Sequence, residues 1–191
     1  ITSTPLKLRQ LGFQEYNIID SVKSMTKYAE MITDPNYIAY HLEKAYHLAT
    51  TGRKGPVWLD IPLNIQSSKV DENKLIHYPT NYTVGKLSSE DKNNVENILN
   101  NAKKPVILAG YGVRMHDSYK EFIEMIDRLQ IPVLTEWNSN DLIPNNHPLY
   151  GGNPGSIGNR GGNFVLQNAD VVLMLGCQLS IRQTSYAWDN F

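Results

Sequence analysis

Residues 51–66 of the chain read Thr51-Gly-Arg-Lys-Gly-Pro-Val-Trp-Leu-Asp-Ile-Pro-Leu-Asn-Ile-Gln66. Gly52 can adopt the left-handed conformation that ends a helix. The apolar run at residues 56–61 predicts a strand buried in a sheet, and a proline follows it. Upstream, Asp34 and Pro35 are typical of a helix start, and apolar residues recur after them at helical spacing. The stretch therefore predicts a helix followed by a buried strand, as in an α/β fold.

The same alternation continues in the second half of the chain. Residues 88–102, which begin with serines and acidic residues, predict a helix, and residues 105–110 predict a strand. The segments that follow are a helix carrying Phe122, Ile123, Ile126 and Leu129, a strand at 131–135, a long loop to Asn159, a short helix at 162–168 and a strand at 170–176. Strand, helix and strand in turn predict a parallel, doubly wound sheet.

Two segments lack such regularity. Residues 1–33 hold short apolar clusters, and we expect a loop, a short helix near residues 18–22 and a connector there. Residues 67–87 are polar and aperiodic, which is typical of a linker between domains. We therefore expect the end of a first domain at 1–66, a linker at 67–87 and a second domain at 88–191.

Composition and motifs give no sign of nucleic-acid binding, a membrane span, disulfide bonding or a zinc site. The 191 residues include 18 basic and 19 acidic side chains, so the net charge of −1 gives no argument for nucleic acid or an anionic membrane as partner. Cys177 is the only cysteine, which rules out an intrachain disulfide and favours a reducing cytoplasm. No apolar run approaches the ~20 residues of a membrane span. Zinc-type clusters of histidine and cysteine, a nucleophile elbow and a Walker loop are all missing from the sequence.

A candidate ligand site follows from the predicted sheet. Ligands of an open parallel sheet bind beyond the carboxyl ends of its strands. This rule selects the segments 110–114, 135–138 and 176–182 and the glycine-rich loop 149–162. Glycines let a backbone approach a phosphate or a flat ring closely. The arginines that could pair with a pyrophosphate are Arg114, Arg160 and Arg182.

Plainer interpretations of the same residues stay open. Gly110-x-Gly112 lacks the third glycine of the dinucleotide fingerprint and equally fits a tight strand-to-helix turn. The glycine-rich loop fits an ordinary surface loop, and each arginine fits a solvated or ion-paired surface residue. Cys177 follows an apolar strand and fits a small packed residue better than a nucleophile.

Several blocks of the sequence, in order and at similar spacing, resemble one known family. They are Leu8-Arg-Gln-Leu-Gly-Phe-Gln-Glu15, Ser24-Met-Thr-Lys27, Tyr40-His-Leu-Glu-Lys-Ala45, Gly52-Arg-Lys-Gly-Pro-Val-Trp-Leu-Asp-Ile-Pro62, Lys104-Pro-Val-Ile-Leu-Ala-Gly-Tyr-Gly112, Ile131-Pro-Val-Leu-Thr-Glu136, Gly151-Gly-Asn-Pro-Gly155 and Asn168-Ala-Asp-Val-Val-Leu-Met-Leu-Gly176. The chain thus resembles thiamine-diphosphate (ThDP) enzymes of the acetolactate synthase (large subunit) family. The resemblance implies that residues 1–66 end a ThDP pyrimidine-binding domain and that residues 88–191 form most of the doubly wound central domain, truncated at its C-terminus.

The resemblance also implies ligand roles for individual residues. The family's FAD contacts fall on Arg53, Gly110, Gly112, Thr135, Glu136, Gly151, Gly152, Gln178 and Arg182. Positions near the family's substrate channel fall on Phe13, Gln14 and Lys27. In the family the flavin is largely structural and takes no net redox part in acetolactate formation.

The chemistry implied by the resemblance is carried by residues that this sequence does not contain. The family's ThDP-activating glutamate belongs to an earlier part of the first domain. Its Gly-Asp-Gly motif for Mg²⁺ and diphosphate belongs to a third domain, and no Gly-Asp-Gly occurs here. We therefore expect an internal piece of a cytoplasmic homo-oligomer, a dimer or tetramer, that acts on a small 2-keto acid. The piece alone should have no catalytic residue, no activity and no bound ThDP or metal.

Two other readings remain. In the first, the enzyme acts on another 2-keto acid and its central domain is a structural spacer without flavin. Tyr111 between the two glycines and the lack of aspartates in residues 176–182 favour it. In the second, the chain is an independent NAD- or nucleotide-binding module, which would need a complete fingerprint and an acid that binds the ribose.

Overall fold

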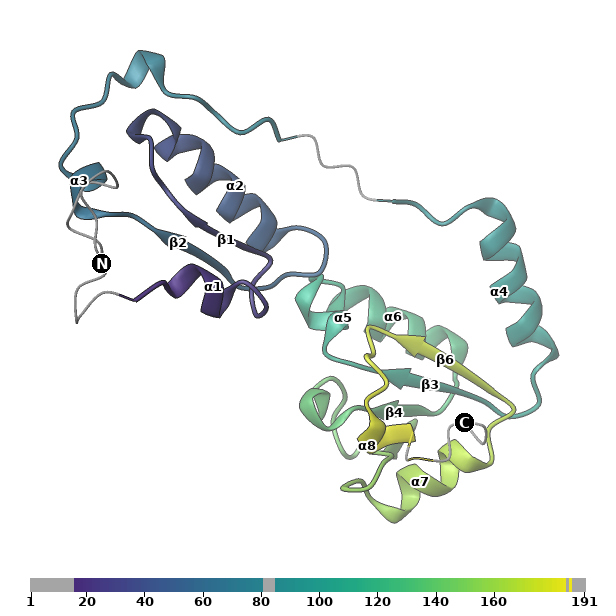
Figure 1. Ribbon diagram of the computed structural model, residues 1–191. Helices are drawn as coiled ribbons and strands as arrows, with labels where there is room; N and C mark the ends of the chain where they lie inside the picture. The colour runs from purple at the N-terminus through teal and green to yellow at the C-terminus, as the bar shows by residue number, and fades with distance from the viewer. Residues whose placement is uncertain (1–15, 81–84, 185, 187–191) are drawn as a thin grey trace. The chain divides into compact units, whose positions relative to one another are not determined.

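The computed structural model describes residues 16–80, 85–184 and 186 (Figure 1). The chain divides into two compact units, Ile1–Gly85 and Lys86–Phe191. Across the described ranges, no helix is both long enough and apolar enough to cross a membrane.

The first unit is a small α/β arrangement around two parallel strands. Its elements in chain order are α1 (Ile18–Val22), β1 (Tyr28–Met31), a 3-10 turn η1 (Pro35–Tyr37), α2 (Ile38–Thr50), β2 (Val57–Asp60), α3 (Leu63–Gln66) and a 3-10 turn η2 (Glu72–Lys74). β1 and β2 pair in register, with Tyr28 opposite Val57 and Met31 opposite Asp60.

The helix start and end predicted from the sequence are confirmed. The side chain of Asp34 accepts a hydrogen bond from the backbone N–H of Asn36 at 2.9 Å, and Pro35 occupies the first position after this cap. Gly52 has a φ of 57°, the left-handed conformation expected after the helix. The predicted helix near residues 18–22 is present as α1.

Two expectations for this unit are wrong. The connector predicted before Asp34 contains the strand β1, whose sequence Tyr-Ala-Glu-Met has no apolar run and becomes a strand through its pairing with β2. The strand β2 is not buried throughout, because Trp58 is 43% exposed. β2 has one neighbouring strand among the described residues, and a strand needs cover on both faces to be fully buried.

The first part of the polar segment 67–87 packs against α2. The backbone N–H of Ile76 donates to the carbonyl of Asn36 at 3.0 Å. Glu43 on α2 accepts two bonds, one from the N–H of Tyr78 at 2.8 Å and one at Nδ1 of His77 at 2.6 Å. These two donors lower the pKa of Glu43. Residues 76–78 are thus attached to the first unit.

The second unit contains a four-stranded sheet. Its elements in chain order are α4 (Ser89–Asn101), β3 (Pro105–Ala109), α5 (Gly112–Met115), α6 (Tyr119–Leu129), β4 (Val133–Thr135), a 3-10 turn η3 (Trp137–Ser139), β5 (Tyr150–Gly152), α7 (Arg160–Gln167), β6 (Val171–Leu175) and α8 (Ile181–Thr184). The strand order is β5-β4-β3-β6, and every pair is parallel.

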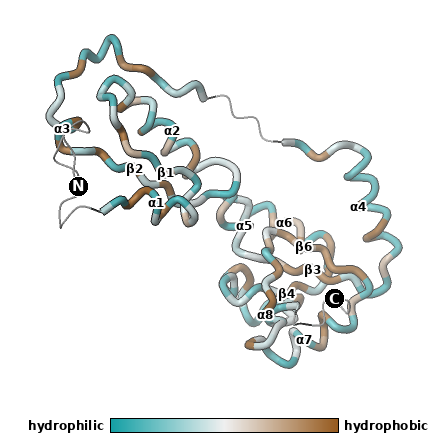
Figure 2. Tube along the Cα trace, viewed as in Figure 1, coloured by the Kyte–Doolittle hydropathy of each residue, from teal (hydrophilic) through white to brown (hydrophobic). Residues whose placement is uncertain are grey.

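The predicted doubly wound sheet is confirmed by the two cores that β3 separates. Ile107 and Ala109 pack with Phe122 and Ile126 of α6, whereas Val106 and Leu108 pack with residues of α7. Figure 1 places α6 and α7 on opposite sides of the sheet, and Figure 2 shows hydrophobic residues gathered along β3, β4 and β6. Alternate residues of a strand point to opposite faces, so a nearly continuous apolar run fits a strand covered on both.

The long loop expected between residues 135 and 159 contains one more strand. β5 pairs with the outer side of β4, with Tyr150 opposite Val133. Its sequence Tyr-Gly-Gly has little intrinsic preference for a strand. It forms because the backbone of β4 offers a free edge, which no local pattern reveals.

Candidate functional site

The strands of the second unit end level with one another. Ala109 at the end of β3 lies opposite Thr135 of β4 on one side and Leu175 of β6 on the other. The chain leaves β3 for β4 through α5 and α6, and later returns through α7 to β6 on the opposite side. The edge beyond β3 and β6 is therefore the topological switch point, where open α/β sheets bind ligands. The structure thus brings together the loops that the sequence rule selected.

Gly110 and Gly112 lie against the turn that follows β6. The N–H of Gly110 donates to the carbonyl of Leu175 at 2.8 Å, and the N–H of Gly112 donates to the carbonyl of Gly176 at 3.0 Å. A Cβ on Gly112 would lie 2.6 Å from the Cα of Gly176. The two glycines therefore allow two backbone segments to touch, which accounts for glycine at both positions without a ligand.

Glu136 is a buried carboxylate at the same edge. It is 5% exposed, and its Oε1 accepts a hydrogen bond from the N–H of Gln178 at 3.2 Å. A Cβ on Gly110 would lie 2.6 Å from Oε2 of Glu136. Within the described ranges no lysine, arginine or histidine forms an ion pair with this side chain. Glu136 thus joins the loops after β3, β4 and β6.

The predicted residue Thr135 is bonded by Asn153, which follows Gly151 and Gly152 in the chain. Its Nδ2 donates to the carbonyl and the hydroxyl oxygen of Thr135, at 2.9 and 2.7 Å. Gly152 has a φ of 106°, and a Cβ there would lie 2.7 Å from the side-chain nitrogen of Asn159. Asn153 was not among the predicted site residues, although an asparagine inside a glycine-rich loop is a recognisable turn residue.

Three cations predicted near this edge differ in their environments. Arg114 is engaged within the protein: its Nη2 lies 2.9 Å from the carboxylate of Asp141, and its guanidinium stacks 4.6 Å above the ring of Tyr119. The backbone carbonyl of Arg182 on α8 accepts from Ser156 at 2.7 Å, which ties α8 to the glycine-rich loop. The side chains of Arg160 and Arg182 are exposed.

Cys177 is a packed, neutral thiol. Its Sγ donates to the carbonyl of Leu108 at 3.0 Å. Burial, followed by the charge of Glu136, raises the pKa of this thiol to about 12. The sequence-based interpretation of Cys177 as a small packed residue therefore agrees with its environment, since a nucleophilic cysteine needs a lowered pKa.

Two predicted residues of the first unit lie side by side. The Nζ of Lys27 donates to the backbone carbonyls of Thr51 and Arg53, at 2.9 and 2.8 Å. Lys27 thereby joins the turn after α1 to the turn after α2. Phe13 and Gln14, the other two residues predicted near the substrate channel, lie outside the described residues.

A cluster of aromatic rings beside α2 was not predicted from the sequence. The hydroxyl of Tyr28 lies 2.5 Å from Nδ1 of His41, and Nζ of Lys44 lies 4.5 Å from the centre of the Tyr28 ring. Burial, with a smaller contribution from Glu30, raises the pKa of Tyr28 to about 12. Burial also lowers the pKa of His41, while Glu30 opposes this change. The available signal was Tyr37 in η1 with Tyr40 and His41 of α2 three and four positions later.

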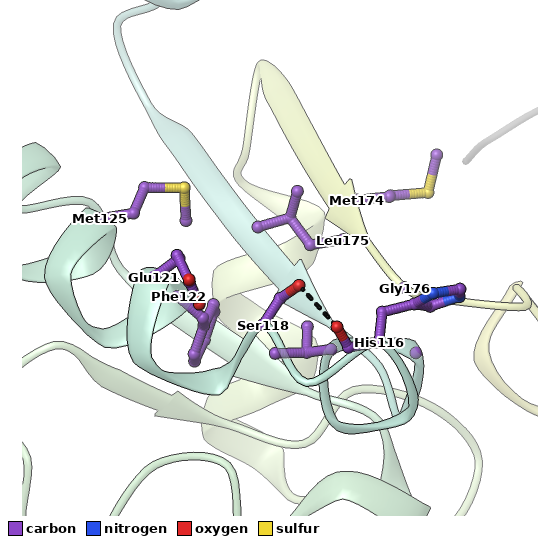
Figure 3. A pocket seen from close by; sticks show the side chains of 10 residues that line it. His116, Ser118, Glu121, Phe122, Met125, Met174, Leu175 and Gly176 are labelled. Carbon is purple, nitrogen blue, oxygen red and sulfur yellow. Dashed lines mark hydrogen bonds between the residues drawn. The ribbon is translucent and has the colours of Figure 1, made fainter. Parts of the chain in front are cut away.

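A separate apolar cavity of about 370 Å³ lies beside β6 (Figure 3). Met125 and Phe122 of α6 face Met174 and Leu175 of β6 across it, and Gly112 is the only predicted ligand residue in its wall. The Ser118 hydroxyl at its mouth donates to the carbonyl of His116 at 3.2 Å. The cavity therefore borders the edge at Gly112 and Gly176, but Glu136 does not line it.

The geometry of the edge does not fit the pyrophosphate of FAD as it stands. The N–H groups of Gly110, Gly112 and Gln178 are all bonded within the protein. A buried carboxylate lies among them. Nor do the described residues contain any group of three or more histidine, cysteine, aspartate or glutamate side chains that could hold a metal ion.

Comparison with known proteins places the chain in a family. The family model described as thiamine pyrophosphate enzyme, central domain, matches residues 93–191. The acetolactate synthase large subunit of Corynebacterium glutamicum is 33% identical over 175 residues, which is 91% of this chain and 28% of that protein. The probable acetolactate synthase large subunit of Methanocaldococcus jannaschii is 30% identical over 181 residues, 91% of this chain and 30% of that protein.

A third relative has a different activity in its name. The sulfoacetaldehyde acetyltransferase of Castellaniella defragrans is 33% identical over 168 residues, 88% of this chain and 28% of that protein. The chain spans less than a third of the length of these curated relatives. With the parallel sheet observed and the central-domain match over residues 93–191, the chain belongs to the thiamine pyrophosphate enzyme family.

Proposed function

We propose that this chain is part of a ThDP enzyme that decarboxylates a 2-keto acid of the pyruvate type and transfers the two-carbon unit to an acceptor. The observation that carries the proposal is its similarity to acetolactate synthase large subunits over about nine tenths of its length, at 30–33% identity. Formation of acetolactate would place the enzyme in branched-chain amino acid biosynthesis. We further propose a cytoplasmic homo-oligomer, a dimer or tetramer.

ThDP with Mg²⁺ supplies the carbanion chemistry of such enzymes. We propose that the residues that activate ThDP and hold its diphosphate lie outside this chain, so no step of the reaction is assigned to its residues. In this proposal residues 1–66 are the last part of the pyrimidine-binding domain, and residues 67–87 link it to the central domain. The central domain, residues 88–191, holds the two cofactor-binding domains of the enzyme in position. Lys27, with Phe13 and Gln14, remains a proposed neighbour of the substrate channel.

A second candidate function has a specific observation in its favour. In it, the enzyme acts on another 2-keto acid, and the central domain is a spacer without flavin. The edge where the family's FAD contacts were expected is closed by Glu136 and by internal hydrogen bonds. Arg53, Thr135, Gly151, Gly152, Gln178 and Arg182 would then have structural roles.

Both candidates can be tested with the full-length protein that contains this chain. Purified with ThDP and Mg²⁺, it should release CO₂ from pyruvate and form acetolactate, whereas the 191-residue chain should do neither. Turnover of another 2-keto acid in place of pyruvate would select the second candidate. Failure of the full-length protein with every 2-keto acid offered would contradict both, and activity of the 191-residue chain would contradict the placement of the catalytic residues outside it.

A further inference from the structure

We propose that Glu136 determines ligand specificity at the carboxyl edge of the second unit, and that its carboxylate excludes diphosphate dinucleotides such as FAD. The inference concerns binding at this edge alone. It therefore holds or fails independently of the reaction proposed above.

The position of Glu136 is the first argument. It follows β4 directly, and the edge next to it lies between the loops after β3 and β6. This is the switch point at which a dinucleotide would place its pyrophosphate against the first glycine-rich turn. Oε2 of Glu136 lies so close to Gly110 that a Cβ there would be 2.6 Å away. The carboxylate therefore occupies the space beside the turn that a phosphate would approach.

The hydrogen bonds of the edge are the second argument. A phosphate at a strand-to-helix turn is held by free backbone N–H groups. Here the N–H of Gly110 donates to the last residue of β6, Leu175, the N–H of Gly112 donates to Gly176, and the N–H of Val113 donates to the carbonyl of Gly110 at 3.2 Å. The N–H of Gln178 donates to Glu136 itself. The carboxylate thus takes a donor that an external anion would use.

Charge is the third argument. Glu136 is 5% exposed, and the described residues provide no ion-pair partner for it. Like charges repel more strongly at a buried position, because the effective dielectric constant there is low. The helix that follows the glycine turn, α5, is four residues long. A single turn contributes little of the dipole that would favour a second anion.

The test measures FAD binding to the 191-residue chain by equilibrium dialysis, with ADP as a second diphosphate and riboflavin as a probe without phosphate. Glu136→Gln removes the charge and keeps a side-chain oxygen for the N–H of Gln178. Glu136→Ser also frees that N–H and some volume. We expect the wild-type chain to retain neither FAD nor ADP, and both variants to bind them at least about tenfold more tightly, with riboflavin unchanged.

Glu124→Gln is the matched control. Glu124 lies on α6 with its side chain 64% exposed, so the same chemical change there should leave FAD binding at the wild-type level. Far-UV circular dichroism and thermal melting establish that each variant is folded. If one Glu136 variant is unfolded, the other still tests the proposal. Wild-type binding of FAD as tight as that of Glu136→Gln would overturn the proposal. So would folded variants that still fail to bind FAD.

Discussion

The strands β2 and β3 have similar sequences but different surroundings. Both are short and mostly apolar, and each follows a helix. In β3, residues from Val106 to Ala109 are at most 3% exposed, because β4 and β6 flank the strand and helices cover both faces. In β2, Trp58 is 43% exposed beside a single neighbouring strand within the described part of the chain. The comparison teaches that an apolar run predicts a strand, whereas its neighbours decide how much of the strand is buried.

The largest expected effect comes from truncating the buried strand. Leu108→Ala should destabilise the second unit by about 2–5 kcal/mol, because Leu108 is fully buried and the change leaves a cavity. Trp58→Ala in β2 should cost only about 1–2 kcal/mol, since much of that side chain already contacts water. Urea denaturation followed by circular dichroism measures both losses. Equal losses would break the comparison of the two strands.

A smaller effect is expected where two loops touch at the end of β3. Gly112→Ala should destabilise the second unit by about 1–3 kcal/mol, because the new methyl group meets the backbone of Gly176 and neither segment can move freely. Gly85→Ala is the matched control: a Cβ there meets nothing within 4 Å. It should change stability by no more than about 1 kcal/mol in either direction. The same urea titration measures both changes. An unchanged stability of Gly112→Ala would show that the close approach of Gly112 to Gly176 does not require glycine.

In the first unit, one carboxylate on α2, that of Glu43, bonds both His77 and Tyr78. The folded pKa of Glu43 is lower than its ordinary value of 4.5. Ionised Glu43 therefore stabilises the folded state fully above its ordinary pKa of 4.5, and this stabilisation is lost as the pH falls through the lowered pKa of the folded state. The amide proton of Tyr78, followed by NMR, should shift with pH in this range, and Glu43→Gln should abolish the shift.

The second unit supplies an internal control for that titration. The N–H of Lys103 donates to Asp170 at 2.7 Å, in the same way as Tyr78 donates to Glu43. Glu43→Gln should leave the pH dependence of the Lys103 amide unchanged. A Tyr78 amide that titrates identically with and without Glu43 would show that another group holds the segment.

The smallest perturbation is chemical labelling of Cys177, which needs no mutation. With a pKa raised to about 12, the thiol is protonated at pH 8 in the folded chain. Alkylation by iodoacetamide should therefore be at least about 100-fold slower in buffer than in urea, where the pKa returns to its ordinary range. Mass spectrometry gives both rates. Fast labelling without urea would mean that the edge near Leu108 opens readily.

Much of the fold could be predicted because its signals are local. Asp34 caps the 3-10 turn η1, which leads into α2, and Ser88 accepts from the N–H of Asp91 at 3.0 Å at the start of α4. The apolar runs of β3 and β6 identified these two neighbouring strands. β1 and β5 were missed because their sequences carry no strand pattern, and each forms only by pairing with a neighbour.

The candidate site, too, could be predicted only in part from the sequence. The rule for parallel sheets correctly brought the loops after β3, β4 and β6 to one edge, because strand order and direction follow from the alternation of elements. Whether Gly110 and Gly112 face a ligand or another loop depends on the register of β3 against β6, which the sequence does not reveal. The same holds for Arg114, whose partner Asp141 lies in a turn with no periodic pattern.

The sequence by itself determined the family, the α/β class and the order of β2, α4, β3, α6, β4, α7 and β6, since helix ends, apolar runs and turns are signalled by neighbouring residues. Only the tertiary structure decided that β2 keeps Trp58 partly exposed, that Glu43 bonds His77 and Tyr78, and that Glu136 fills the edge beside Gly110. These features depend on contacts between residues far apart in the chain, and such contacts are set by packing and register, which short-range patterns do not encode.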